Sequence, residues 1–155
     1  MTVTLCILRH GRAMGQGPDA LLGPEGEAYV ARLGRKLAGS GLRPVAAYSS
    51  PYRRARETAS IVLGELASDA RLTFVPDLAP DVDAAEALGA LQSHGLPEGH
   101  VLVVSHLPLV ATLARSLADV SLDFQPGTYA EIELAPGGVT GALRRFIGPN
   151  ELDGT

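Results

Sequence analysis

Short apolar runs alternate with amphipathic stretches along most of this chain. The runs at residues 3–8, 45–48, 72–75 and 101–104 consist almost entirely of apolar side chains, which is typical of parallel strands buried on both faces. The stretches between them repeat apolar residues at helical spacing. Strands that alternate with helices in this way predict an α/β domain with a mainly parallel sheet.

Four helices are expected, each with a start signal or an apolar stripe. The first begins at Pro24 and ends before the Gly39-Ser40-Gly41 stop, and the second follows Ser49-Ser50-Pro51. The third spans about residues 84–93 after a loop at residues 76–83, and the fourth begins at Pro108. Their apolar stripes are Val30, Leu33 and Leu37 in the first helix, Ala55, Ala59, Val62 and Leu66 in the second, and Leu109, Leu113 and Leu117 in the fourth.

The end of the chain differs in pattern. Residues 129–134 alternate polar and apolar side chains, and a Pro136-Gly137-Gly138 turn separates them from residues 140–147, which indicates an antiparallel hairpin. We expect the last few residues to form a loose tail. The predicted fold is therefore one domain over residues 1–155, a three-layer α/β/α sandwich whose mostly parallel sheet has an antiparallel edge hairpin.

Composition narrows the function classes. With 155 residues, 46% of them hydrophobic, and a net charge of −4, the chain can bury a core but lacks the basic surface that nucleic acids or anionic membranes require. Cys6 is the only cysteine, lies in the first apolar run, and is expected to be a buried packing residue. With no secretory leader or membrane span visible, we expect a soluble cytoplasmic protein, and nothing requires more than a monomer.

Chemistry-bearing side chains follow three of the predicted strands. They are Arg9-His10-Gly11, the segment at residues 49–58 with three arginines, and Ser105-His106. Because parallel strands place their carboxyl ends at one edge of a sheet, these segments are expected to converge there. Histidine is suited to act as a nucleophile near neutral pH, and arginine binds phosphate bidentately. The convergence indicates phosphoryl transfer.

The set Leu8-Arg9-His10-Gly11, Ser50-Pro51-x-x-Arg54-Ala55-x-x-Thr58 and Ser105-His106 resembles the histidine phosphatase superfamily, with its phosphoglycerate mutase-like fold. The short length and the segment 104–110 are most similar to the small SixA-type phosphohistidine phosphatases. The resemblance implies that His10 becomes phosphorylated and that Arg9, Arg54 and a protonated His106 hold the phosphoryl oxygens. Water would hydrolyse the intermediate without a metal or cofactor, and the substrate would be phosphohistidine on a signalling protein.

The residues near these four are expected to have supporting roles. The family pattern selects Arg54, so Arg53 and Arg56 are expected at the solvated rim. We expect structural hydrogen bonds from Thr58 and Ser105, and additional substrate contacts from Gln16 and Arg12. Larger relatives carry an acidic proton donor on an inserted segment, whereas the loop here is short. None of Asp77, Asp81 and Asp83 can be assigned to that role.

Three alternatives stay open. The same site would also suit a small phosphomonoester as substrate. Only the short loop at residues 76–83 argues against this alternative. A phosphate-binding module would not need both His10 and His106. The Gly11-x-x-x-Gly15-x-Gly17 spacing is that of short-chain dehydrogenases, which bind a nicotinamide cofactor, but Pro18 interrupts the helix expected there and a Tyr-x-x-x-Lys pair is absent from the sequence.

Overall fold

The computed structural model describes residues 2–153 and contains one six-stranded sheet, in the order β3-β2-β4-β1-β5-β6. Strands β1, β2, β3 and β4 pair in parallel, whereas β5 is antiparallel to β1 and β6 is antiparallel to β5. The strands are β1 (Val3–Arg9), β2 (Pro44–Ser49), β3 (Leu72–Phe74), β4 (Gly99–Ser105), β5 (Tyr129–Leu134) and β6 (Gly141–Ile147). The helices are α1 (Pro24–Gly39), α2 (Arg53–Glu65), α3 (Ala84–His94), α4 (Leu109–Ala118) and α5 (Pro149–Asp153), with a 3₁₀ turn at Pro76–Leu78. The predicted α/β class with an antiparallel edge hairpin is confirmed.

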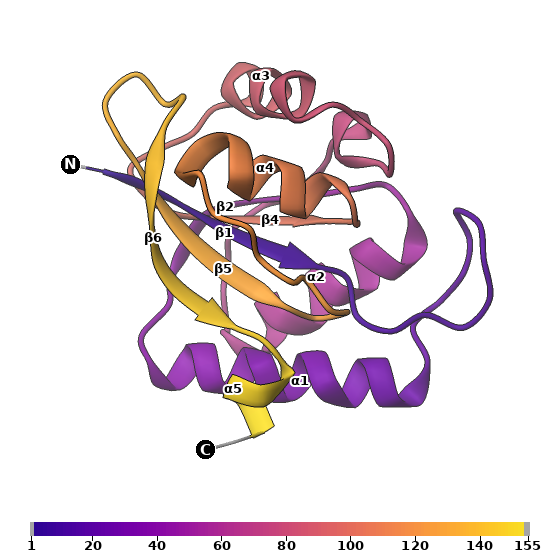
Figure 1. Ribbon diagram of the computed structural model, residues 1–155. Helices are drawn as coiled ribbons and strands as arrows, with labels where there is room; N and C mark the ends of the chain where they lie inside the picture. Colours follow the sequence, from indigo (N-terminus) through magenta and orange to yellow (C-terminus); the bar gives the residue numbers. More distant parts are fainter. Residues whose placement is uncertain (1, 154–155) are drawn as a thin grey trace.

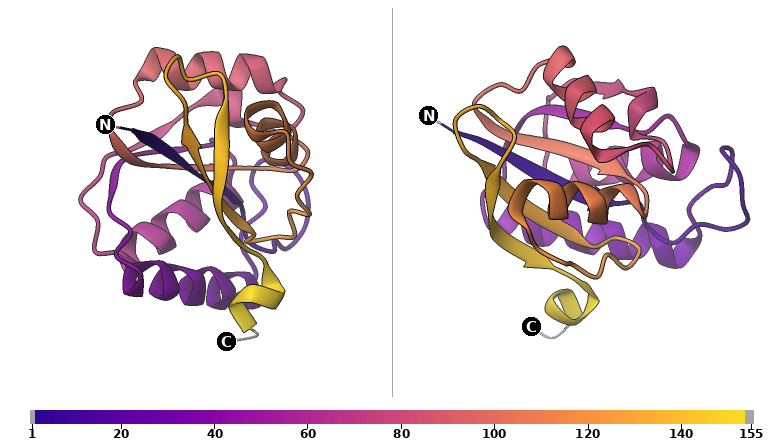
Figure 2. Two further views of the ribbon diagram at one scale, coloured as in Figure 1. Left: turned by 60° about the vertical axis from the view of Figure 1, so that its left-hand side comes forward. Right: turned by 45° about the horizontal axis from the view of Figure 1, so that its top comes forward.

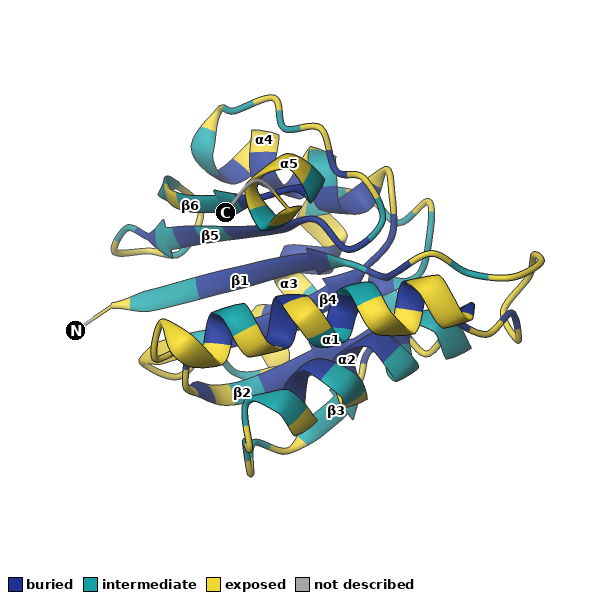
Figure 3. Ribbon diagram, turned by 90° about the horizontal axis from the view of Figure 1, so that it is seen from below, coloured by how far each residue is buried: buried dark blue, intermediate teal, exposed yellow. Residues whose placement is uncertain are grey.

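Helices cover both faces of the sheet, with α3 and α4 on one face and α1, α2 and α5 on the other (Figures 1 and 2). Strand β1 lies between the two cores: Leu5 and Ile7 pack with α3 and α4, whereas Cys6 and Leu8 pack with α1 and α2. Figure 3 shows the buried stripe of α1 against the sheet and its exposed outer face. A strand buried on both faces needs a continuous apolar run, as found at residues 3–8.

The carboxyl ends of β1, β2 and β4 meet at one edge of the sheet because the three strands are parallel neighbours. The pairing aligns Arg9 with Ser105 across β1 and β4, and Ser49 with Val104 across β2 and β4. The three chemistry-bearing segments therefore leave the sheet side by side, as predicted.

The prediction that the last few residues form a loose tail is wrong for the residues up to 153. Residues 149–153 form α5, which begins at Pro149. The carboxylate of Glu151 accepts a hydrogen bond from the backbone N–H of Gly148 at 2.7 Å, and Leu152 packs against the core on the α1 side. A helix this short has little stability of its own, so these tertiary contacts hold it. Residues 154–155 lie outside the described part of the chain.

Two further predictions concern burial and membranes. Cys6 is fully buried, and burial is the main cause that raises the pKa of its thiol to about 12, so the expected packing role is supported.

Among the described residues, no helix is both long enough and apolar enough to cross a bilayer.

Candidate active site

His10 lies directly after β1 and is buried. Its backbone N–H donates to the carbonyl of Ser105 at 3.0 Å, and its Nδ1 lies 2.7 Å from the carbonyl oxygen of Gly11. A carbonyl only accepts, so Nδ1 carries the proton and Nε2 is left with a free lone pair. Burial, opposed by the Gly11 hydrogen bond and reinforced by Arg54 and Arg9, lowers the pKa of His10 to about 4. The ring is therefore neutral near pH 7.

Arg54 reaches His10 from the first turn of α2. Its Nε donates to His10 Nε2 at 3.3 Å, and its Nη1 donates to the carbonyl of Gly17 at 2.8 Å. The guanidinium thus lies beside the atom that would attack phosphorus, where it can balance charge on a transferring phosphoryl group. The contact to Gly17 also ties the exposed loop after β1 to the site.

His106 lies after β4, with its ring centroid 5.0 Å from that of His10. Its Nε2 lies 2.7 Å from Oγ of Ser50, and its buried Nδ1 has no hydrogen-bond partner among the described residues. Burial first, and then His10, Arg54 and Arg9, lower its pKa to about 3. His106 is therefore neutral near pH 7 in the protein without a bound dianion, because burial and the nearby cations Arg54 and Arg9 disfavour a further positive charge. The expectation of a protonated His106 concerns the site that holds a phosphoryl group, and it stays a prediction.

Arg9, the last residue of β1, points its guanidinium toward the loop between α4 and β5. Its Nη1 donates to the carbonyl of Phe124 at 2.8 Å, and its buried Nε has no partner among the described residues. Burial and the neighbouring Arg54 lower the pKa of Arg9, although a guanidinium remains charged at physiological pH. Arg9 and His106 therefore each have one buried nitrogen without a hydrogen-bond partner within residues 2–153.

These side chains share one open cleft of about 280 Å³. Its lining residues are Arg9, His10, Ala13, Gly15, Gln16, Gly17, Arg54, Pro80, His106 and Leu107. The four predicted catalytic residues are thus brought together, with Gln16 beside them. No carboxylate is among the described residues that line the cleft.

Other candidates lie outside the cleft. Arg12 lines a separate concavity along α1, next to Glu25 and Tyr29. Arg53 pairs with Glu57 at 3.0 Å within α2. Of the three aspartates left unassigned, none lines the cleft, and Asp83 instead caps α3 by accepting from the N–H of Ala85 at 2.7 Å.

Arg56 also turns away from His10. Its Nε donates to the carbonyl of Pro51 at 2.9 Å, and its guanidinium lies over the ring of Phe74 at 5.9 Å. The expected rim positions of Arg53 and Arg56 agree with these contacts.

Thr58 and Gly26 fix the loop that carries His10. The Thr58 hydroxyl accepts from the backbone N–H of Gly11 at 3.0 Å and donates to the carbonyl of Arg54 at 2.8 Å. On the α1 side, a Cβ at Gly26 would lie 2.2 Å from the carbonyl oxygen of Arg12, so only glycine allows this approach. Ser105, the other expected structural residue, donates to the carbonyl of Leu78 at 2.6 Å.

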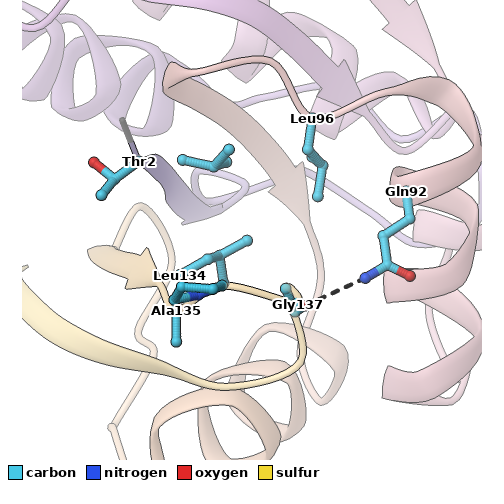
Figure 4. A pocket seen from close by; sticks show the side chains of 9 residues that line it. Thr2, Gln92, Leu96, Leu134, Ala135 and Gly137 are labelled. Carbon is cyan, nitrogen blue, oxygen red and sulfur yellow. Dashed lines mark hydrogen bonds between the residues drawn. The ribbon is translucent and has the colours of Figure 1, made fainter.

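A second concavity of about 390 Å³ lies at the opposite end of β1, between α3 and the β5–β6 hairpin (Figure 4). Apolar side chains such as Leu96 and Leu134 line it, and Gln92 donates across its edge to the carbonyl of Gly138 at 3.3 Å. None of the described residues that line it is a histidine, a cysteine or an acidic residue, so we assign it no catalytic chemistry. Within residues 2–153, no group of three or more histidines, cysteines and carboxylates is placed to hold a metal ion.

Comparison with known proteins agrees with this geometry. The family model of the histidine phosphatase superfamily (branch 1) matches residues 5–79. A structure of the protein histidine phosphatase SixA complexed with tungstate superimposes with a TM-score of 0.86 and 26% sequence identity, covering 96% of this chain and 99% of that one. This chain carries a histidine phosphatase superfamily domain.

Two more proteins are similar to this chain. A SixA-named protein from Nakamurella multipartitia superimposes with a TM-score of 0.79 at 21% identity, covering 96% of this chain and 97% of that one, which shows the shared fold. The 2,3-bisphosphoglycerate-dependent phosphoglycerate mutase of Thermobifida fusca (strain YX) is 39% identical over 69 residues, which is 40% of this chain and 28% of that protein. The chain therefore matches less than a third of the mutase.

The histidine phosphatase domain also contains site contacts that sequence reasoning missed. The carbonyls of Phe124 and Gly17 orient the two arginines, and the Ser50 hydroxyl contacts His106. Backbone carbonyls leave no mark in a sequence. Ser50 belongs to the motif that selected Arg54, but the motif gives no sign of a partner 56 positions away.

Proposed function

We propose that this protein is a phosphatase that works through a phosphohistidine intermediate on His10. The observation that carries the proposal is the unprotonated Nε2 of His10, with the Arg54 guanidinium 3.3 Å away. Nucleophilic attack on a phosphoryl group requires a free lone pair and compensation of negative charge at the same place. Arg9 and His106 add buried nitrogens to the same cleft.

The reaction has two steps. The lone pair on His10 Nε2 attacks phosphorus, the bond from phosphorus to the leaving group breaks, and the leaving group takes its electron pair and a proton from solvent. Water then attacks the phosphorus of the phosphohistidine, the P–N bond breaks, and inorganic phosphate leaves while Nε2 regains its lone pair. Arg9, Arg54 and His106 hold the phosphoryl oxygens in both steps.

A phosphohistidine side chain on a protein is the substrate that the cleft suits best. A leaving group that is hard to expel needs a positioned general acid, and no carboxylate is among the described residues of the cleft. Imidazole leaves readily because the P–N bond is labile. The cleft is also open, so a protein surface can approach it. The likeness to a protein histidine phosphatase over 96% of the chain supports this choice.

A small phosphomonoester is the second candidate. It is favoured by the identity of 39% with a phosphoglycerate mutase, which covers 69 residues. The two candidates share the nucleophile and differ only in the leaving group, so a substrate comparison separates them.

The test compares phosphate release from a phosphohistidine-bearing protein domain and from an aryl phosphate. We expect the wild-type protein to release phosphate from both substrates and His10→Ala to release none from either. His94→Ala is the control and should release phosphate at wild-type rates, because His94 is exposed and does not line the cleft. Phosphate release from the aryl phosphate alone would favour small phosphomonoesters as the substrates. Turnover of either substrate by His10→Ala would refute the assignment of His10 as the nucleophile.

We further propose that no metal takes part, because two guanidiniums and an imidazole donor already oppose the phosphoryl charge. Activity should survive an excess of chelator. Loss of activity that added divalent metal restores would contradict this part of the proposal. We also propose that the protein is cytoplasmic and monomeric.

A further inference from the structure

We propose that Ser50 is a positioning residue that sets the tautomer of His106 and so reserves its Nδ1–H for a phosphoryl oxygen. This inference rests on the proposed function, because it assigns a role within the same site. Ser50 is the first residue after β2 and is fully buried. Its Oγ lies 2.7 Å from Nε2 of His106. Ser50 itself does not line the cleft.

The direction of this hydrogen bond follows from the other partners of Ser50. The backbone N–H of Tyr52 donates to Ser50 Oγ at 3.1 Å, so the hydroxyl already accepts one bond. Its single proton then needs an acceptor, and His106 Nε2 is the one found among the described residues. If Nε2 donated instead, both the hydroxyl proton and the unprotonated Nδ1 would be buried without a partner, whereas an accepting Nε2 leaves only the Nδ1–H unpaired, and each unpaired buried group is costly. Nε2 therefore accepts, and Nδ1 carries the proton.

This tautomer gives a neutral His106 a useful role. Its pKa of about 3 means that the ring has one proton near pH 7, and the position of that proton decides whether Nδ1 attracts or repels an anion. With Nε2 occupied by Ser50, Nδ1 is the ring nitrogen left for a ligand, and it is buried without a partner among residues 2–153. Ser50 thus converts His106 into a donor without a full charge.

The turn at residues 50–52 also restrains the ring itself. Tyr52 packs edge-on against His106 with centroids 4.9 Å apart, and the Arg54 guanidinium lies 5.1 Å from the Tyr52 ring. Ser50 accepts the Tyr52 N–H and contacts His106. One short segment therefore sets the orientation of His106 and its proton position together.

The chain offers a closely matched control for a test. Ser49 is the neighbouring residue and is as deeply buried, but its hydroxyl donates to the carbonyl of Ser50 at 2.9 Å and does not contact His106. Three variants are compared with the wild type: Ser50→Ala, Ser50→Thr and Ser49→Ala. Ser50→Thr retains a hydroxyl and serves as the rescue. Thermal unfolding of each variant establishes that it is folded.

The decisive readout is the ring tautomer, measured by nitrogen–proton correlation NMR on protein labelled at histidine nitrogen. We expect the Nδ1–H form at His106 in the wild type, in Ser49→Ala and in Ser50→Thr. In Ser50→Ala the Nε2–H form should become populated. A wild-type spectrum with Nε2–H at His106, or an unchanged Nδ1–H form in Ser50→Ala, would overturn the inference. The wild-type spectrum alone decides if Ser50→Ala does not fold.

Kinetics with an aryl phosphate provide the functional arm. We expect kcat/KM to fall about 10- to 100-fold in Ser50→Ala, less than the loss expected when a donor is removed outright. It should stay within about 3-fold in Ser49→Ala and Ser50→Thr, since neither removes the contact. An equal loss in both alanine variants would overturn the role of Ser50. Failure of the wild type to turn over any phosphate substrate would instead refute the proposed function, while the tautomer measurement would still decide this inference.

Discussion

Nε of Arg54 lies 3.3 Å from Nε2 of His10, although the two residues are 44 positions apart in the chain. The contact joins the end of a strand to the first turn of a helix. It requires an unprotonated Nε2, which the contact between His10 Nδ1 and Gly11 supplies. Nucleophile and cation are therefore placed together before any substrate binds, so that little reorganisation is needed during reaction.

Replacing Arg54 tests whether this contact matters for catalysis. Arg54→Lys keeps the charge but loses the planar fork that reaches both His10 and Gly17. We expect kcat/KM to fall by about 100-fold or more. Arg53→Lys is the control, because Arg53 pairs with Glu57 on the helix surface, and it should change kcat/KM by less than about 3-fold. An equal fall of kcat/KM in Arg54→Lys and Arg53→Lys would show that Arg54 has no special role in catalysis.

Thr58 is expected to couple stability to activity. Thr58→Val keeps the shape of the side chain but leaves the Gly11 N–H without its acceptor in a buried place. The free energy of unfolding, measured in urea, should fall by about 1–3 kcal/mol, and kcat should fall with it because the nucleophile loop loses its tie to α2. In the control Thr112→Val, an exposed helical threonine loses only a bond to the carbonyl of Leu109. Its stability should stay within about 0.5 kcal/mol of wild type.

Gly26→Ala tests the close approach of α1 to the nucleophile loop. The new Cβ would lie 2.2 Å from the carbonyl oxygen of Arg12, and backbone must shift to relieve that clash. We expect a loss of about 1–3 kcal/mol in the free energy of unfolding and a weaker affinity for inorganic phosphate. Gly89→Ala, in α3 with no atom within 4 Å of the new Cβ, should stabilise by up to about 1 kcal/mol. A neutral Gly26→Ala variant would show that the loop can move freely.

The pH dependence of stability follows from the two depressed histidine pKa values. In the folded protein, His10 has a pKa of about 4 and His106 of about 3, whereas an ordinary histidine has about 6.5. Between roughly pH 6.5 and 3 these two histidines therefore bind more protons in the unfolded chain than in the folded one. Stability is complete above that window and is lost as the pH falls through it. The part of the loss that comes from these two histidines should level off below about pH 3.

Urea unfolding at pH 7.5 and pH 4.5 measures this effect. We expect the wild type to lose on the order of 5 kcal/mol between the two values, about half of it from each histidine. A double variant with His10→Asn and His106→Asn should lose clearly less, because asparagine does not titrate. His94→Asn provides the control for removal of an exposed histidine. An identical loss in the wild type and the double variant would show that other groups cause the pH dependence.

Much of the fold could be predicted from residue patterns alone. The continuous apolar runs identified four parallel strands, and the alternation at residues 129–134 identified the antiparallel one. Glycine and proline signals placed the start and end of α1. Helix α5 was missed because residues 149–153 carry one apolar side chain, Leu152, and its burial depends on the rest of the fold.

The candidate site was predictable in its membership and less so in its chemistry. His10, Arg54 and His106 follow strands whose parallel order brings them to one edge. Whether His106 carries a proton depends on burial and on the cations beside it. Neither quantity can be read from neighbouring residues in the sequence, so the charge of the His106 ring in the free site could not be predicted.

By itself, the sequence determined the order of strands β1 to β6 and of helices α1 to α4, and the residue types at each strand end, because these depend on local periodicity and local backbone preference. The tertiary structure alone decided which nitrogen of His106 carries the proton and how the Arg54 guanidinium meets Nε2 of His10. It also decided which carbonyls hold the guanidiniums in place. Those features depend on contacts between residues that are 37 to 115 positions apart, and only strand register and helix packing bring such residues within hydrogen-bond distance.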